Sequence, residues 1–92
     1  MEVMFSPGQI VATPGAMALL DKVGRNGSDL LSRHLQGDWG DVCKEDAAQN
    51  NQALEDGERL LSSYEFKPID KKIWIITEHD RSVTTILLPE EY

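Results

Sequence analysis

The sequence predicts an α+β domain in which two or three helices pack on a carboxy-terminal antiparallel meander of three strands. Two runs rich in β-branched and aromatic residues, 72–77 and 83–88, flank a polar break from Glu78 to Ser82, which is typical of a β-hairpin. Helix signals fill much of the preceding chain, and a chain of 92 residues supports one core. We therefore expect a single α+β domain over residues 1–92, with the helices covering one face of the sheet.

The amino-terminal third predicts a short strand followed by two helices. Gln9–Ala12 follows a Ser-Pro-Gly turn signal and is expected on an edge of the sheet. Thr13-Pro14 supplies an N-cap and a first helical residue, and Gly24 is expected to end this first helix in the left-handed conformation. Ser28 is then expected to cap a second helix over residues 29–35.

The middle of the chain predicts a third helix from about Asp41 to Asp56 and then a strand from Glu58 to Phe66. The helix follows a Gly-Asp-Trp-Gly break and is ended by Gly57. Its expected buried stripe consists of Cys43, Ala47, Asn50 and Leu54. The strand alternates, and the residues expected on one side are Leu60, Ser62, Tyr64 and Phe66. A turn over 67–71, which contains Pro68, leads into the hairpin.

Both faces of the predicted hairpin are largely apolar. Ile73, Ile75 and Thr77 share one face, whereas the alternate residues Trp74 and Ile76 share the other. An antiparallel sheet covered on one side normally has a polar second face. Either the amino-terminal segment covers the second face, or that face pairs with another copy of the chain, which predicts a homodimer through a sheet face.

The charge balance disfavours nucleic acid as a partner. Sixteen acidic residues against nine Lys and Arg give a net charge of −7, which repels phosphate. Seven acids and one base, Lys44, lie between Asp38 and Glu58. They form either a solvated helix face or an acidic patch that binds a basic protein partner. The candidate binding residues in and beside this region are Trp39, Asp41, Glu45, Asp46 and Asn50.

The cysteine content and the absence of targeting signals predict a cytoplasmic protein without a membrane partner. The chain has one cysteine, Cys43, and shows no leader and no apolar run of bilayer length. Cys43 is expected to be a buried apolar residue. No zinc spacing, phosphate loop or dinucleotide fingerprint is present, so we expect no metal and no cofactor.

His34 is the first candidate for chemistry. It lies on the last turn of the second predicted helix, whose carboxyl end favours an imidazolium. Asp38 is expected to lie within reach and to orient the ring, which would supply half of an acid–base pair. The alternative is a histidine that caps its helix or packs in the core. Trp39 is likewise either a core anchor or an aromatic wall for a ligand ring.

The hairpin loop is the second candidate. Glu78, His79 and Arg81 lie in a short segment with Asp80 and Ser82, and loops held by a rigid sheet often carry function. The alternative is a solvated tip. Thr77 and Thr85 could share a sheet face beside Arg81, and hydroxyls next to a guanidinium suit a phosphate or carboxylate.

Three long stretches carry a resemblance to known proteins. They are FSPGQIVATPG at 5–15, Arg33-His34 together with GDWGD at 37–41, and ITEHDRSVTTILLPEEY at 76–92. The chain resembles a family of small bacterial proteins that are carried on plasmids and other mobile elements. The resemblance covers nearly the whole chain. It implies a mobile-element origin and brings no established activity with it.

A second resemblance lies in the order of the elements. Helices followed by an antiparallel meander resemble the barnase- and RelE-like RNases, which use His, Arg, Glu and hydroxyl residues on the sheet without metal. This implies catalytic roles for His34, Glu78, Arg81 and Thr84, although the acidic balance departs from the basic character of such RNases.

Three functions follow from these observations. The favoured one is a non-enzymatic acidic protein-interaction module. As a protein encoded on a mobile element, it would bind a host defence protein or a nucleic-acid-binding protein. The alternatives are a small metal-independent RNase or hydrolase, with His34 or His79 as proton shuttle, and a module that binds a small anion.

Overall fold

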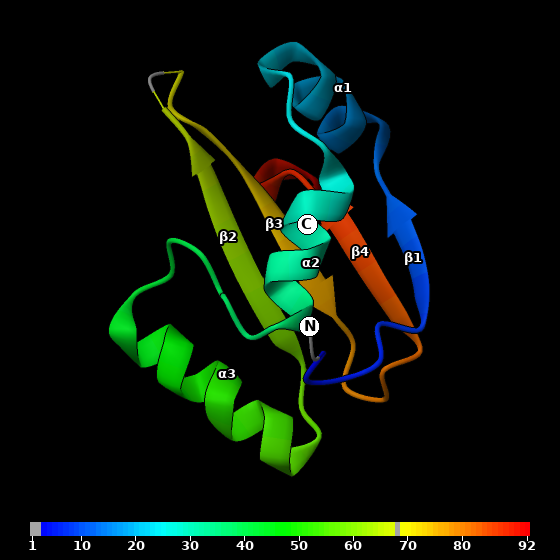
Figure 1. Cartoon of the computed structure of the whole chain (residues 1–92), viewed down its shortest axis with the longest axis vertical. Helices are drawn as coiled ribbons and strands as arrows, with labels where there is room; N and C mark the ends of the chain where they lie inside the picture. The colour runs from blue at the N-terminus through cyan, green and yellow to red at the C-terminus, as the bar shows by residue number, and fades with distance from the viewer. Residues whose placement is uncertain (1–2, 68) are drawn as a thin grey trace.

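The computed structural model describes residues 3–67 and 69–92, which form an α+β domain with a mixed four-stranded sheet (Figure 1). The strands are β1 (Gln9–Ala12), β2 (Leu60–Phe66), β3 (Lys71–Thr77) and β4 (Val83–Leu87). The helices are α1 (Pro14–Val23), α2 (Gly27–Leu35) and α3 (Lys44–Asp56), followed at the carboxyl end by the 3-10 turn η1 (Pro89–Glu91). The expected turn residue Pro68 lies outside the described residues.

The order of strands in the sheet is β1-β4-β3-β2. β1 runs parallel to β4, and the other two pairs are antiparallel. The α+β class and the β3–β4 hairpin are therefore confirmed. The expected helices on a three-stranded antiparallel meander are matched only in part: β2, β3 and β4 are antiparallel, but the possible edge strand at 9–12 is present as β1 and joins β4 in parallel, which makes a mixed sheet of four strands. Sequence patterns indicate which strands pair when the strands follow each other in the chain. β1 and β4 come from opposite ends of the chain, so no local pattern indicates that they pair.

The first two helices begin and end close to their predicted positions. The Thr13 hydroxyl accepts a hydrogen bond from the Ala16 N–H at 3.1 Å, and Gly24 ends α1 with φ at 69°. The expected Ser28 cap of α2 is wrong. Asn26 is the N-cap, and its side-chain oxygen accepts from the Ser28 N–H at 3.0 Å, which places Ser28 inside the first turn.

The third helix begins later than predicted. Cys43 is its N-cap and is exposed, so the expectation of a buried Cys43 is wrong. The buried residues of α3 are Asn50 and Ala53. Of the predicted stripe, only Asn50 is buried; Ala47 and Leu54 are half-buried, and Cys43 lies at the exposed start of the helix.

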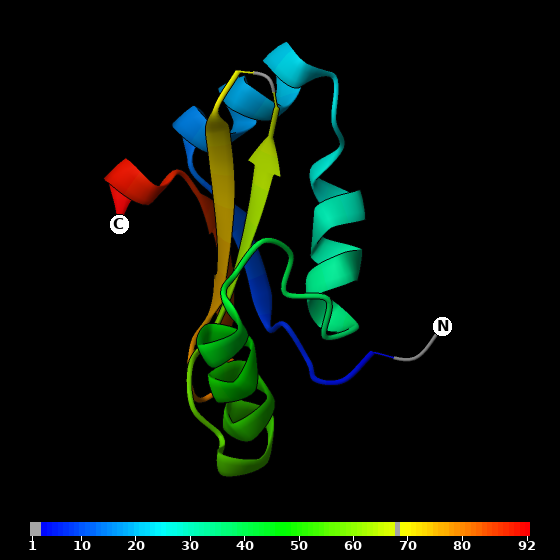
Figure 2. The ribbon, with the colours of Figure 1, turned by 90° about the vertical axis from the view of Figure 1, so that its left-hand side faces the viewer.

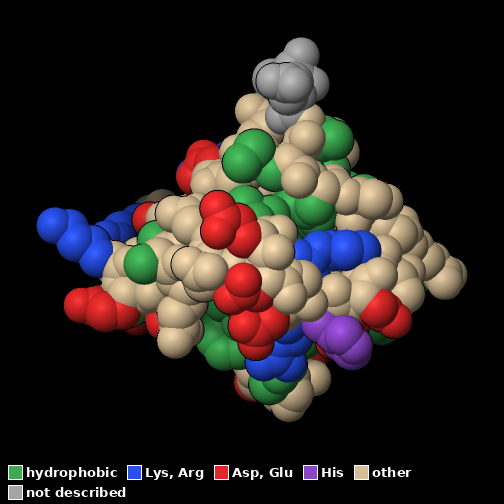
Figure 3. Space-filling view, turned by 90° about the horizontal axis from the view of Figure 1, so that it is seen from below, with side chains coloured by type: hydrophobic (Ala, Val, Ile, Leu, Met, Phe, Trp, Pro, Cys, Tyr) green, Lys and Arg blue, Asp and Glu red, His purple; other side chains and the backbone are tan. Residues whose placement is uncertain are grey.

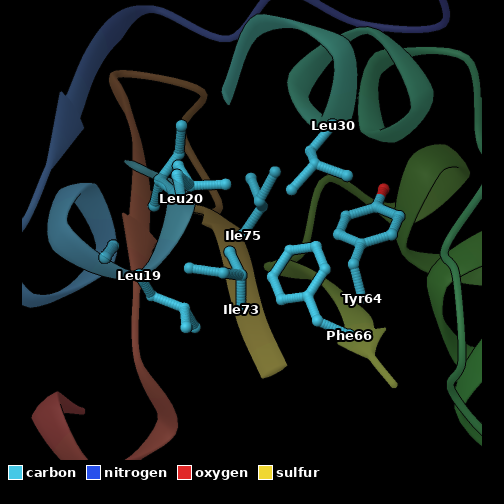
Figure 4. Close-up of a cluster of buried hydrophobic side chains, with 9 residues drawn as sticks. Leu19, Leu20, Leu30, Tyr64, Phe66, Ile73 and Ile75 are labelled. Atoms are coloured by element: carbon cyan, nitrogen blue, oxygen red, sulfur yellow. The ribbon is translucent and has the colours of Figure 1, made fainter. Parts of the chain in front are cut away.

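The main core lies between α1, α2 and one face of the sheet (Figure 2). Figure 4 shows leucines of α1 and α2 pointing toward aromatic and isoleucine side chains of β2 and β3. The buried members of this cluster are Ala16, Leu19, Leu20, Leu30, Tyr64, Phe66, Ile73, Ile75 and Ile86. Trp39, Ala53 and Leu60 form a smaller cluster beside α3. Burial on this face confirms the alternation predicted for β2.

The second face of the sheet is partly covered by the carboxyl end of the chain. In Figure 2, η1 lies on the side of the sheet opposite α2. Tyr92 packs edge-on against Trp74 with ring centroids 6.0 Å apart. Phe5, in the described part of the amino-terminal segment, packs against His34 instead. The expectation that this segment covers the second face is therefore wrong for the described residues.

Candidate functional site

A chain of buried polar side chains crosses the middle of the structure. His34 of α2 is fully buried, and its Nδ1 lies 2.5 Å from the Ser62 hydroxyl. Its Nε2 lies 2.9 Å from the Thr77 hydroxyl, which in turn lies 2.7 Å from the Thr84 hydroxyl. Thr84 donates to the Pro7 carbonyl at 2.8 Å. This series of hydrogen bonds thus joins α2, β2, β3 and β4 to the segment that leads into β1.

The carbonyl of Pro7 fixes the direction of every hydrogen bond in this chain, because a carbonyl only accepts. Since the Thr84 hydroxyl donates to it, Thr84 must accept from Thr77. Thr77 has then used its proton and accepts from His34 Nε2–H. The bare Nδ1 is left to accept from Ser62. A neutral, Nε2-protonated His34 therefore satisfies every buried group in the chain.

The environment of His34 lowers its pKa to about 4. Burial penalises the charged ring, and the positive charge of Arg81 adds to the effect. The expectation that the helix end favours an imidazolium is therefore wrong here, because the loss of hydration outweighs the helix dipole. Both ring nitrogens are bonded within the core, so neither is available to a substrate.

Asp38 does not orient His34, which corrects the predicted acid–base pair. Its carboxylate pairs with Arg33, 2.7 Å from Nε, and accepts from the Gly40 N–H at 3.2 Å. Arg33 lowers the pKa of Asp38 and also lies over the Tyr64 ring. A fully buried histidine and a carboxylate that is half exposed and paired with Arg33 cannot meet without a large desolvation cost.

Arg81 is a structural link between α3 and the hairpin loop. Its guanidinium donates to the carbonyls of Ala53 (3.2 Å), Glu58 (2.7 Å), Glu78 (3.1 Å) and His79 (3.3 Å). The Ala53 carbonyl lies in the last turn of α3 and also accepts from the N–H groups of Gly57 and Glu58, so Arg81 adds a further donor at the helix end. Arg81 is therefore occupied by the protein's own backbone, which leaves few donors for a phosphate.

The two threonines expected beside Arg81 do not share a face. Thr77 pairs with Thr84, and Thr85 pairs with Ile76 in the same ladder. Thr77 and Thr84 are buried on the helix side, so Thr85 lies on the second face. The predicted hydroxyl surface for an anion is therefore wrong. Thr85 is one residue beyond Thr84, the partner of Thr77, and successive residues of a strand point to opposite faces of the sheet.

Three of the candidate binding residues cover the outer edge of β2. The Asn50 amide donates to the Leu61 carbonyl at 2.8 Å and accepts from the Leu61 N–H at 3.1 Å. The Asp41 N–H donates to the Ser63 carbonyl at 2.6 Å, and the Asp41 carboxylate accepts from the Glu65 N–H at 2.9 Å. The Trp39 carbonyl accepts from the Ser63 N–H at 3.1 Å. The outward backbone groups of Leu61 and Ser63 and the N–H of Glu65 are thereby occupied.

The remaining candidates lie on the surface. Glu45 and Asp46 are exposed in the first turn of α3, and His79 is exposed in the β3–β4 loop. Glu78 is half-buried at the end of β3. Figure 3 shows acidic side chains at this end of the molecule with basic ones among them. Trp39, by contrast, is buried and donates from its indole to Asn51, so it is a core anchor.

The edge of β1 differs from the edge of β2. All four residues of β1 are exposed. The N–H groups of Gln9 and Thr13 donate to β4. Because inward and outward positions alternate in a parallel pair, Ile10 and Ala12 direct their backbone groups away from the sheet. Among the described residues no strand lies beside this outer edge of β1, whose inner edge pairs with β4.

An open groove runs beside β1 on the helix side. It has a volume of about 790 Å³ and lies between β1, α1 and the start of α2. Its apolar lining comes from Ile10, Ala12, Met17, Leu20, Leu31 and Ile86. Ile10 and Met17 are 48% and 60% exposed, so the groove begins at the strand edge. An unpaired edge beside an apolar groove is the arrangement that receives an extended chain.

The sequence contains signals both for the buried polar side chains around His34 and for the exposed apolar edge of β1. Ser62 and Thr77 interrupt the apolar face that is otherwise buried, and His34 stands among the leucines of α2. Buried hydroxyls at such positions require partners. The stretch from Val3 to Leu20 contains no charged residue, in a chain of net charge −7. That stretch holds five of the seven large exposed apolar side chains in the described structure.

Residues 3–67 and 69–92 contain neither a helix that could cross a membrane nor a cluster of side chains that could hold a metal ion. No helix there has the length and apolar character that a membrane crossing needs. No group of three or more His, Cys, Asp or Glu side chains is arranged to hold a metal ion in that part of the chain. Comparison of the chain with family models, curated proteins and solved structures found no match.

Proposed function

We propose that the protein is a non-enzymatic interaction module that binds an extended polypeptide segment along the open edge of β1. In this mode the segment adds a strand to the sheet, and one of its apolar side chains enters the neighbouring groove. Backbone hydrogen bonds supply affinity, and the groove supplies selectivity. The observation that carries the proposal is the bare, uncharged edge of β1 beside exposed Ile10 and Met17.

The contrast between the two edges of the sheet supports the proposal. Side chains and a short loop occupy the outer backbone of β2, whereas within residues 3–67 and 69–92 nothing comparable lies on the outer edge of β1. Exposed edges are normally protected by charge, proline or a covering element, since they recruit other strands. β1 has no charged residue, although the chain as a whole is strongly charged.

The candidate residues for catalysis fit structural roles better than chemical ones. His34 is enclosed, bonded at both nitrogens and neutral, while Arg81 holds the end of α3. General acid–base chemistry needs a group within hydrogen-bond reach of a substrate. The RNase alternative and the anion-binding alternative both lose their central residues to these contacts.

The acidic surface of α3 offers a second mode of binding. Glu45, Asp46, Glu55 and Asp56 are all exposed, and the helix is buried only through Asn50 and Ala53. A basic protein is the partner that this charge favours, and the mobile-element origin implied by the resemblance makes a host nucleic-acid-binding or defence protein a suitable one. Such binding should weaken steeply between low and physiological salt, whereas strand addition at the uncharged edge should not.

A displayed library of random peptides tests strand addition directly. Peptides are selected on the wild-type protein and then measured against Ala12→Pro. Proline at position 12 removes an outward N–H and leaves the inward bonds to β4 in place, which edge strands tolerate. We expect alternating apolar peptides whose affinity falls at least about tenfold in Ala12→Pro, the order expected when backbone hydrogen bonds are lost.

The matched control is Val3→Lys, which adds a charge to an exposed valine outside β1. Peptides that bind through the edge should retain their affinity for this variant. Selection of no peptide, or of peptides that bind Ala12→Pro as tightly as the wild type, would contradict strand addition at β1.

A further inference from the structure

The charge distribution limits how two copies of this chain can meet. Each copy carries a net charge of −7, so most surfaces of two copies repel each other. The stretch from Val3 to Leu20, which contains β1, has no charge to contribute to that repulsion. It also holds Ile10 and Val11, which are 48% and 37% exposed. An uncharged apolar edge on an acidic molecule is therefore most compatible with a second uncharged edge.

The blocked edge of β2 determines how such an assembly would end. Asn50 and the Trp39–Asp41 segment occupy the outward backbone of β2, so β1 of one copy cannot continue onto β2 of the next. Pairing of β1 with itself uses the same surface on both copies. Such an isologous contact has two-fold symmetry and closes at two copies.

The outward positions of β1 fix one antiparallel register. With Val11 on the two-fold axis, Ile10 lies opposite Ala12 of the partner subunit and can exchange backbone hydrogen bonds with it in both directions. Val11 faces Val11 of the partner subunit at a non-hydrogen-bonded position, where β-branched side chains pack closely. Every outward backbone group of Ile10 and Ala12 is then paired.

Side-chain sizes agree with this register. Ile10 and Ala12 both face the groove on the helix side of the sheet. In the antiparallel pair the large Ile10 of one copy lies against the small Ala12 of the other, next to Met17, which is 60% exposed. Each groove therefore receives an isoleucine where an alanine leaves room for it.

We propose that two copies of the chain pair through antiparallel β1 strands about a two-fold axis at Val11, which gives a continuous sheet of eight strands, four from each copy. This inference rests on the proposed function, since it names the second copy as the segment that the edge receives. A strand of four residues buries little area, so the association should be weak, on the order of micromolar.

Sedimentation velocity tests the dimer over concentrations from about 5 to about 500 µM, which bracket a weak association. The wild type should pass from monomer to dimer. Val11→Lys places two like charges face to face, and Ala12→Pro removes an outward N–H. Each should weaken dimerisation at least about tenfold, while Val3→Lys should leave it unchanged. Circular dichroism checks that every variant is folded.

Cross-linking tests the register. In a Cys43→Ser background, Val11→Cys places two thiols opposite each other at a non-hydrogen-bonded position, where Cα atoms are about 4.5 Å apart and a disulfide fits. Gln9→Cys is the control, since position 9 would lie opposite position 13 of the other copy. Mild oxidation should link Val11→Cys chains rapidly and Gln9→Cys chains slowly.

The outcomes separate this inference from the proposed function. A monomer at every concentration overturns the dimer, and peptides that bind β1 would then still support strand addition. A dimer that survives both Val11→Lys and Ala12→Pro also overturns the inference, because its interface must lie elsewhere, such as the second sheet face. A dimer disrupted equally by Val3→Lys, or equal cross-linking of Gln9→Cys, overturns the edge register.

Discussion

Mild acid should destabilise the protein through one side chain, His34. Its pKa is about 4 in the folded protein and 6.5 in an unfolded chain. Between these values the unfolded state binds a proton that the folded state does not, so the free energy of unfolding falls as the pH falls. The full difference corresponds to about 3 kcal/mol, of which about 2 kcal/mol is lost between pH 7.5 and pH 5.

The structure explains the direction of this effect. A second proton would reside on Nδ1, which accepts from the Ser62 hydroxyl in the neutral state. Ser62 would have to turn from donor to acceptor, and a charge would be created in a fully buried site near Arg81. Carboxylates with lowered pKa values, such as Asp38, lose their contribution only at lower pH, below about 4.

Urea unfolding followed by tryptophan fluorescence between pH 5 and 7.5 measures the effect. His34→Gln should be less stable than the wild type at pH 7.5 by about 1–3 kcal/mol, because a buried partner is lost, but should lose most of the acid sensitivity. His79→Gln, in the exposed loop, should keep the sensitivity of the wild type. Equal pH dependence in the wild type and His34→Gln would refute this reasoning, as would nitrogen chemical shifts that place the proton on Nδ1.

Three further substitutions test the contacts that place the edges of the sheet. Asn50→Leu should lower the free energy of unfolding by about 2 kcal/mol in urea titrations, because it leaves the N–H and C=O of Leu61 without partners. Arg81→Lys should destabilise almost as much as Arg81→Met and increase proteolysis at the end of α3, because an ammonium cannot reproduce the fork that reaches several carbonyls. Gly8→Ala should destabilise by more than about 1 kcal/mol and disorder β1 in nuclear magnetic resonance spectra, because Gly8 has φ at 65° and an added Cβ would lie 2.3 Å from the Ser82 carbonyl.

The parts of the fold that were predicted correctly depend on local patterns. The β3–β4 hairpin is encoded by two apolar runs around a polar break, and the ends of α1 by Thr13, Pro14 and Gly24. The parallel pairing of β1 could not be read in this way, because its partner lies at the far end of the chain. A short strand pattern gives no information about the direction of its neighbour.

The candidate site was harder to predict because its contacts are long-range. His34 was correctly noticed, but its partners Ser62 and Thr77 come from two strands far along the chain, and the nearer Asp38 is bound to Arg33. Sequence proximity favoured the wrong partner. The buried hydroxyls were the better guide, since a polar side chain on an apolar face needs a hydrogen bond.

Residue-resolved hydrogen exchange of the backbone amides in β1 tests the central claim most directly. At low concentration the outward amides of Ile10 and Ala12 should exchange freely, while the inward amide of Thr13 is protected by Ile86. Raising the concentration, or adding a selected peptide, should protect Ile10 and Ala12 selectively. Outward amides that are protected at every dilution, or that stay unprotected when a ligand is bound, would contradict an edge that functions by receiving another strand.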